Sequence, residues 1–418
     1  MKSVEYMLKR SEGGSIINTS PSAEKKGRTN SKIKLSPAKT NLVDTESNEI
    51  LKKSISSNAS LGAARSAKND EFYTQYVDIE KEMNAYLELN ELVFKDKTVY
   101  LPCDDPEWSN FTKYFAQNFE RLGLKKLIST SFAANSKPSE IQYQPTLFEI
   151  ESPQFDEAKT FSRGKIFTLT RDVDGDKKVN FSDLEWNYLE GDGDFRSEEI
   201  TKIRDESDVI ITNPPFSLFR EFLDWIIKGR KSFSIIGNMN AITYKEPFSL
   251  IKSEKIWLGA SISSGDREFR VPDSYPISAA GWRIDKDGKK FVRVKGVRWF
   301  TNIDHGRRHQ PLALMTMDDN LKFSKHKEVR DTTYRIYDNY DAIEVPFTDA
   351  IPSDYPGVMG VPISFLDKFS PEQFEIVGLA AGNIRGLAGI PTKTGKDGPY
   401  IDGKLKYGRI MIRHRRLK

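Results

Sequence analysis

Apolar residues gather in four short runs between residues 97 and 242, and amphipathic segments lie between them. The runs are KTVYLPCDDP (97–106), which Pro102 or Pro106 ends, KKLISTSF (125–132), DVIIT (208–212) and KSFSIIGNMNAI (231–242). Their length and their β-branched and aromatic content predict buried strands. Helical spacing of apolar positions predicts helices after Val77, from Ser109 as N-cap to Gly123, and from Ser217 to Gly229.

Strands that alternate with helices are typical of a doubly wound α/β domain, whose ligand sites lie at the carboxyl ends of the strands. The stretch between residues 133 and 206 has no such rhythm and is expected to be an irregular insertion. After residue 255 the pattern changes, and GWRIDKDGKKFVRVKGVRWFTN (281–302) predicts a β-hairpin around its Lys-Asp-Gly turn. This C-terminal part is expected to be a mixed α+β region.

Composition and charge separate one end of the chain from the rest. The net charge of the 418 residues is +4, but residues 1–68 hold 13 Lys and Arg against 6 Asp and Glu, a net of +7. This Ser-, Asn- and Lys-rich segment is predicted to be a disordered tail, either solubilising or an arm for nucleic acid. The chain has one cysteine and no apolar stretch of membrane length, so a soluble, cytoplasmic protein without disulfides is expected.

Residues 213–216 spell Asn-Pro-Pro-Phe directly after the third apolar run. Pro214 restricts Asn213 to extended conformations, and Pro215 extends that rigidity. The Asn213 side-chain oxygen and the Pro214 carbonyl can then converge as two acceptors, which suits a planar amino group with two N–H donors. Phe216 offers a face on which a base can stack. The segment therefore predicts chemistry on an amino group; the alternative is a turn that only ends a strand.

Several motifs in order resemble the EcoRI-type adenine-specific DNA methyltransferase family. They are NDEFYTQYVDIEKEM, YLPCDDPEWSNFTKYF, LEGDGDFRS, DVIITNPPFSLFREF, VRWFTN and YGRIMIR, and they extend from about residue 69 to the C-terminus. The resemblance implies a Rossmann-like class I S-adenosylmethionine-dependent methyltransferase domain at residues 69–255. Residues 256–418 would form the target-recognition and C-terminal DNA-binding region.

The same resemblance assigns cofactor-binding residues. Segment 71–74 would lie against the methionine end of S-adenosylmethionine, and segment 103–106 stands where related enzymes have a glycine-rich loop, although no FxGxG is present here. Asp194 and Phe195 match the acid and the aromatic that hold the adenine of the cofactor. A strand-end turn for the second segment and a plain acidic loop for the third remain open. The cofactor-binding residues are Glu71, Phe72, Tyr73, Thr74, Cys103, Asp104, Asp105, Pro106, Asp194 and Phe195.

The substrate implied by the family is adenine in double-stranded DNA, which must be flipped out of the helix for its amino group to be reached. Basic residues among the aromatic residues Trp282, Trp299 and Phe300 are expected to contact bases or phosphates. They are Arg283, Arg293, Lys295, Arg298, Arg307 and Arg308, with Arg270 and Lys290 nearby. The expected protein is a monomer that shares its site with a restriction endonuclease. RNA or protein glutamine as methyl acceptor, or an inactive DNA-binding relative, are the alternatives.

Three further patterns resemble functional sites of other kinds. RDVDGDKKVNFSDLE (171–185) imitates a calcium loop, but Lys177 stands at the position of the required glycine and the last ligand is Asp183 in place of Glu. His305 and His309 have the spacing of a zinc pair without a third ligand. Cys103 follows a proline, as the nucleophile of cytosine-ring methyltransferases does, but its position is that of the cofactor loop. No metal site is predicted.

Overall fold

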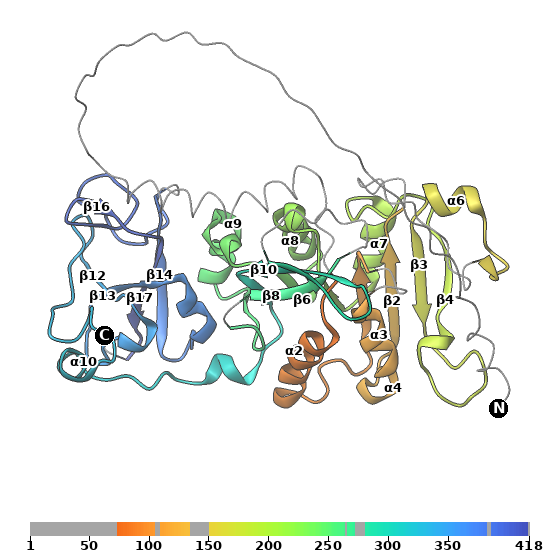
Figure 1. Cartoon of the computed structure of the whole chain (residues 1–418), viewed down its shortest axis with the longest axis horizontal. Coiled ribbons are helices and arrows are strands. Elements are labelled where there is room, and N and C mark those ends of the chain that lie inside the picture. The colour runs from red at the N-terminus through yellow and green to blue at the C-terminus, as the bar shows by residue number, and fades with distance from the viewer. Residues whose placement is uncertain are drawn as a thin grey trace, which may run out of the picture. The chain divides into compact units, whose positions relative to one another are not determined.

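The computed structural model describes residues 73–104, 109–133, 150–263, 266–271, 281–382 and 386–416, all of which belong to one compact unit (Figure 1). The tail predicted for residues 1–68 lies outside the described residues. So do four predicted cofactor-binding residues: Glu71, Phe72, Asp105 and Pro106.

A mixed sheet of eight strands carries the site, in the order β4-β3-β2-β1-β5-β6-β11-β7. Its four central strands, β2, β1, β5 and β6, run parallel. The flanking strands β3 and β11 run antiparallel to them, as the opposed arrows of β2 and β3 show in Figure 1. The strands are β1 Thr98–Pro102, β2 Lys126–Ser131, β3 Lys165–Leu169, β4 Glu185–Tyr188, β5 Val209–Thr212, β6 Ser232–Asn238, β7 Trp257–Leu258 and β11 Val297–Thr301.

Both faces of the parallel strands are buried, in two separate cores. In β5, Ile210 packs into the core that holds Phe222 of α8, whereas Val209 and Ile211 pack into the core that holds Met83 of α2. Successive side chains of a strand point to opposite faces, so helices cover the sheet on both sides, which explains the continuous apolar runs. The helices are α2 Tyr76–Leu89, α3 Asn110–Gln117, α4 Phe119–Leu122, α6 Glu157–Ser162, α7 Glu198–Glu206, α8 Phe219–Lys228, α9 Lys245–Lys252 and α10 Met317–Phe323.

The four apolar runs form β1, β2, β5 and β6, as predicted. The helix predicted from Ser109 to Gly123 is divided into α3 and α4, because Asn118 leaves the helical conformation at φ −108° and ψ 14°. The expectation of an irregular insertion between residues 133 and 206 is wrong for its described part, which contains α6, β3, β4 and α7. The large sheet also takes in β7 and β11, which follow residue 255 in the chain.

A separate three-stranded sheet, β8-β10-β9, contains the predicted hairpin. β9 (Trp282–Ile284) and β10 (Lys290–Lys295) pair antiparallel, and Gly288 adopts a φ of +78° in their turn, a conformation that favours glycine. β8 (Asp266–Arg270) lies on the other side of β10, in front of the large sheet in Figure 1.

The C-terminal residues form two further sheets, and a buried ion pair joins the short helix η7 (Ile363–Lys368) of this part to the large sheet. Arg298 on β11 donates from Nε and Nη2 to the two carboxylate oxygens of Asp367, at 2.6 and 2.9 Å. The strands are β12 Ala342–Glu344, β13 Val358–Pro362, β14 Phe374–Ala380 and β17 Arg409–His414 in one sheet, and β15 Tyr400–Ile401 with β16 Lys404–Leu405 in the other. Within the described chain, no helix combines the length and the apolar character that crossing a membrane requires.

Candidate active site

The Asn-Pro-Pro-Phe segment leaves the carboxyl end of β5, between the parallel neighbours β1 and β6. The chain proceeds from β1 to β2 on one side, whereas β5 lies on the other side of β1. The strand order therefore reverses between β1 and β5, and in open α/β sheets ligands bind in the crevice at such a point. The loops after these two strands carry Cys103 and Asp104 on one side and Asn213 to Phe216 on the other.

Asp104 joins these two loops. Its buried carboxylate accepts hydrogen bonds from the Thr212 hydroxyl at 2.6 Å and from the Ser109 hydroxyl at 2.7 Å. The Ser129 hydroxyl, on β2, donates to the Asp104 carbonyl. Because Thr212 directly precedes Asn213, the Asp104 carboxylate holds the start of the Asn-Pro-Pro-Phe segment.

Cys103 takes a backbone conformation that is rare for residues other than glycine. Its φ is +70°, and its side chain is exposed. The tight turn after β1 is thus made by a cysteine in the left-handed region, at the place where the resemblance implies a glycine-rich loop.

Tyr73 and Thr74 connect the start of α3 to the three-stranded sheet. Tyr73 exchanges backbone hydrogen bonds with Arg270 of β8, at 2.9 and 3.3 Å. Thr74 is 4 % exposed, and its carbonyl accepts from the Asn110 side chain at 2.7 Å. Its hydroxyl is buried and has no hydrogen-bond partner among the described residues. A buried hydroxyl in this state suits a polar ligand such as the methionine end of the predicted cofactor.

Asp194 and Phe195 lie at the same edge of the sheet. Gly193, with a φ of +88°, passes so close to the end of β2 that a Cβ would lie 2.5 Å from the Ser131 carbonyl oxygen, so the turn requires glycine. Hydrogen bonds from Arg196 hold the pKa of Asp194 below its ordinary value, with its carboxylate accepting from Nη2 at 2.6 Å. The Phe195 ring is buried and packs edge-on against Phe222 and Trp225. Phe195 therefore supports the loop from within the core.

Phe216 is partly buried and contacts the three-stranded sheet. Its ring lies edge-on to Phe269 of β8, with the centroids 6.5 Å apart. The predicted catalytic segment and the predicted recognition region thus meet at two aromatic side chains. Phe269 was not predicted as a site residue, because nothing in its local pattern distinguishes it from an ordinary core phenylalanine.

The predicted DNA-binding residues fall into different environments. Arg293 and Lys295 are exposed on one face of β10, and they alternate along the strand with the buried Val292 and Val294. Arg283 pairs with Glu268 at 2.5 Å and covers the Phe291 ring.

Arg307 and Arg308 lie in the short helix η5 (Gly306–His309) and make contacts within the protein. Arg307 donates to the Ala260 carbonyl at 2.7 Å, and Arg308 pairs with Glu254 and lies over the Trp257 ring.

The prediction that Arg298 contacts DNA is wrong. Arg298 is 4 % exposed and its guanidinium is paired with Asp367, so it has no surface to offer to a duplex. Trp299 and Phe300 beside it are fully buried in the two cores.

Positive charge gathers instead near α3. Burial lowers the pKa of Lys113, and the nearby charges of Arg270 and Lys289 lower it further.

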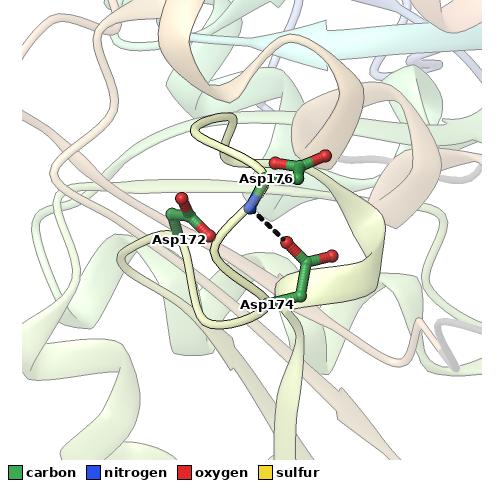
Figure 2. A group of neighbouring side chains, drawn as sticks. All are labelled: Asp172, Asp174 and Asp176. Carbon is green, nitrogen blue, oxygen red and sulfur yellow. Dashed lines mark hydrogen bonds between the residues drawn. The ribbon is translucent and has the colours of Figure 1, made fainter.

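The loop that imitates a calcium site carries three carboxylates close together, as Figure 2 shows for Asp172, Asp174 and Asp176. They accept backbone hydrogen bonds within the loop, including one from the Asp176 N–H to Asp174 at 3.1 Å and one from the Gly175 N–H to Asp172 at 2.6 Å. The buried Asp183 accepts from the Val173 N–H at 2.7 Å. These hydrogen bonds explain the acidic residues, because the carboxylates hold the backbone of the turn in place.

The two histidines of the HGRRHQ motif have separate environments. His305 is buried, with its Nε2 atom 2.9 Å from the Leu258 carbonyl oxygen, and burial lowers its pKa. His309 lies near the surface between Glu372 and Asp304, whose hydrogen bonds raise its pKa. Both therefore have protein partners of their own.

Comparisons with known proteins agree with the motifs. The family model described as adenine-specific methyltransferase EcoRI matches residues 60–415. The type II methyltransferase M.EcoRI of Escherichia coli is 42 % identical over 361 residues, covering 86 % of this chain and 98 % of that protein. Type II methyltransferases M.MgeORF184P of Mycoplasma genitalium and M.MpnI of Mycoplasma pneumoniae are 32 % and 31 % identical, covering 85 % and 84 % of this chain and 98 % and 97 % of their own lengths. No solved structure matches significantly.

Proposed function

The chain belongs to the EcoRI family of adenine-specific methyltransferases, and from this premise we propose that it methylates the N6 amino group of a flipped adenine in a short duplex DNA site. The observation that carries the proposal is the position of the Asn-Pro-Pro-Phe segment. It lies at the carboxyl end of β5, at the reversal of strand order, with Asp104 bound to the residue before it. The reversal of strand order supports a Rossmann-like class I domain.

The cofactor of the proposed reaction is S-adenosylmethionine, which when bound supplies an activated methyl group. Tyr73, Thr74 and the loop at Cys103 and Asp104 would hold it, together with Asp194, whose loop passes close to the end of β2. The buried Thr74 hydroxyl is the described atom that best fits this role, since Thr74 contacts Asn110 at the start of α3 and its hydroxyl has no partner among the described residues. For Asp104 we propose a second role, the positioning of Thr212 and hence of Asn213.

The protein residues act on the amino group of the adenine. The Asn213 side-chain oxygen and the Pro214 carbonyl accept its two hydrogens, and Phe216 provides a face for the base. This arrangement directs the nitrogen lone pair away from the ring and toward the methyl group. S-adenosylmethionine would supply the methyl group that this nitrogen takes up, and the amino group would release one proton to solvent in exchange. The residues supply position and electrostatic complementarity, with no covalent link to the protein.

The direct test is expression in a host that lacks DNA methylation, followed by mapping of N6-methyladenine in its genome. We expect one short motif to be modified throughout. Purified protein with labelled cofactor should transfer methyl groups to duplex DNA, and transfer to RNA or protein alone would contradict the proposal. The mapped motif would also be the site of a cognate restriction endonuclease, which we propose as the functional partner. Light scattering checks the prediction of a monomer.

A further inference from the structure

The helix α2 contains a fully buried carboxylate, Glu82, that takes no part in the proposed methyl transfer. Its Oε1 atom accepts hydrogen bonds from the Tyr86 hydroxyl at 2.7 Å and from the Ala260 N–H at 3.0 Å, and its Oε2 atom accepts from the Ser261 N–H at 2.7 Å. Burying a carboxylate costs free energy unless hydrogen bonds of this kind satisfy it. Two of the three donors belong to the backbone of one loop, 178 residues further along the chain at Ala260.

This loop, residues 259–263, is held tightly against Glu82. Gly259 passes so close that a Cβ would lie 2.0 Å from the Glu82 Oε1 atom, so the approach requires glycine. The carbonyl groups of the loop bind cations, whereas its N–H groups bind the anion, and charged partners make the stronger hydrogen bonds. The two donors are Arg307, to the Ala260 carbonyl at 2.7 Å, and Arg298, to the Ser263 carbonyl at 3.1 Å.

The same helix also contacts β8, which follows this loop in the chain. Asp78 precedes Glu82 by four residues and therefore lies on the same face of α2. Its carboxylate is 3.8 Å from the Nε atom of Arg267 on β8. Just before the helix, Tyr73 exchanges backbone hydrogen bonds with Arg270, at the end of β8. Residues 73–82 and 260–270 thus run antiparallel to each other and are joined at three places.

These contacts determine where the three-stranded sheet lies relative to the predicted catalytic segment. β8 pairs with β10, the strand on which Arg293 and Lys295 are exposed. From the same sheet, Phe269 of β8 meets Phe216 of the Asn-Pro-Pro-Phe segment edge-on. A displacement of β8 would therefore move the exposed basic side chains away from their place beside the catalytic segment.

We propose that Glu82 is a positioning residue, which holds the three-stranded sheet in the one place where it binds duplex DNA beside the catalytic segment. This inference rests on the proposed function. Without the Glu82 hydrogen bonds, the sheet would occupy this place for only part of the time. The apparent affinity for DNA would fall by that fraction, because only the correctly arranged protein binds.

DNA that is bound would in turn stabilise the correct arrangement of the sheet. At saturating DNA, the protein would therefore transfer methyl groups at nearly the normal rate. Loss of the Glu82 carboxylate should thus raise the KM for DNA and leave kcat almost unchanged. A defect that merely unfolds part of the protein has the reverse pattern, since it lowers kcat through a smaller active fraction and leaves KM as it was.

The test compares Glu82→Gln and Asp78→Asn with two control variants. Glutamine keeps the size of the Glu82 side chain but has one acceptor oxygen in place of two, so a loop N–H loses its acceptor. Tyr86→Phe is the first control, because it removes a buried hydrogen bond to Glu82 without a direct contact to the loop. Glu80→Gln is the second, because it neutralises an exposed carboxylate of the same helix.

For each variant, kcat and KM are measured with a duplex that contains the motif mapped for the wild type, at saturating S-adenosylmethionine. Equilibrium binding gives the Kd of the duplex and, separately, the Kd of S-adenosylmethionine. We expect Glu82→Gln to raise the Kd and KM of the duplex roughly 10- to 100-fold, the range that a hydrogen bond to a charged group gives. Its kcat and its Kd for S-adenosylmethionine should stay within about threefold of the wild type.

Asp78→Asn should change the Kd of the duplex in the same direction, by about two- to fivefold, because its ion pair is long and partly exposed. Tyr86→Phe and Glu80→Gln should both bind the duplex like the wild type. If Glu82→Gln does not fold, Asp78→Asn decides the question against Glu80→Gln, and equal Kd values for these two variants overturn the inference.

The inference is also overturned if Glu82→Gln lowers kcat and leaves the KM of the duplex unchanged, or if it binds the duplex like the wild type. A Tyr86→Phe variant that binds DNA as weakly as Glu82→Gln overturns it too, because a general loosening of the core would then be the cause. Failure of the wild type to methylate the duplex is a different result, since it overturns the proposed function and this inference with it.

Discussion

The hydroxyl of Thr212 donates a hydrogen bond of 2.6 Å to the Asp104 carboxylate, across the two adjacent parallel strands at the reversal of the sheet. Thr212 is the last residue of β5 and Asp104 follows β1 by two residues. The contact links the loop that would hold the cofactor to the segment that would hold the adenine. A substitution that displaces one of these two loops should therefore displace the other.

Thr212→Val removes this hydroxyl and keeps the shape of the side chain. The buried Asp104 carboxylate then loses one of its donors, which should lower the free energy of unfolding by about 1–3 kcal/mol. The turnover of the folded protein should fall as well, because Thr212 directly precedes Asn213 and its hydrogen bond holds that residue in position. Urea unfolding and single-turnover methyl transfer measure the two effects, with the exposed Thr170→Val as control. Unchanged turnover in Thr212→Val would show that the contact does not position the segment.

The positive φ of Cys103 predicts the order of three variants. Cys103→Gly should fold with the stability of the wild type or better, whereas Cys103→Val should lose about 1–2 kcal/mol, since a β-branched residue is strained in the left-handed region. Cys103→Ala should keep its turnover and at most bind the cofactor more weakly. If Cys103→Ala binds the cofactor normally but transfers no methyl group, the thiol is a nucleophile after all.

Arg298 and the exposed residues of β10 should respond to mutation in opposite ways. Arg298→Met leaves Asp367 buried without its partner, which should cost about 3–5 kcal/mol of unfolding free energy. Arg293→Ala and Lys295→Ala should stay within about 0.5 kcal/mol of the wild type. Each phosphate contact that they lose should lower the slope of log affinity against log salt by about one. A slope unchanged in both variants would remove these residues from the DNA interface.

His309 and His305 should give opposite pH dependences of stability. The raised pKa of His309 means that its stabilising contribution is complete below its unfolded pKa and is lost as the pH rises through the folded pKa. The lowered pKa of His305 means that stability falls as the pH drops below the unfolded value of about 6.5. His309→Gln should therefore destabilise more at pH about 5.5 than at about 8.5. Its surface position keeps the effect small.

His305→Gln serves as the counterpart, since it should remove the loss of stability at acid pH. Urea unfolding at the two pH values gives the two slopes. Equal slopes in the wild type and both variants would show that neither histidine changes its pKa on folding.

The apolar runs were sufficient to predict the parallel centre of the fold. Strands buried on both faces read as continuous apolar segments, which is why β1, β2, β5 and β6 were identified from the sequence. β3 and β4 were missed because they lie among charged residues in a long segment without rhythm. β7 has only two residues, Trp257 and Leu258, too few for any period.

Among the site residues, too, a contact could be predicted when its partner is near in the sequence and could not when the partner is distant. Ser109 was predicted as an N-cap, and its hydroxyl indeed accepts from the Phe111 N–H at 3.1 Å. Arg298 was misjudged because its surroundings in the sequence are basic, while the partner that buries it lies 69 residues away. The contact between Asp104 and Thr212 spans 108 residues and leaves no local pattern.

The central claim is that Asn213 binds the amino group that is methylated, and single-turnover transfer by Asn213→Ala tests it most directly. The assay uses duplex DNA that contains the mapped motif, and equilibrium binding of S-adenosylmethionine is measured on the same preparation. We predict that the rate of transfer falls on the order of 100-fold or more while cofactor affinity stays within a few fold. Transfer at the wild-type rate would contradict the claim.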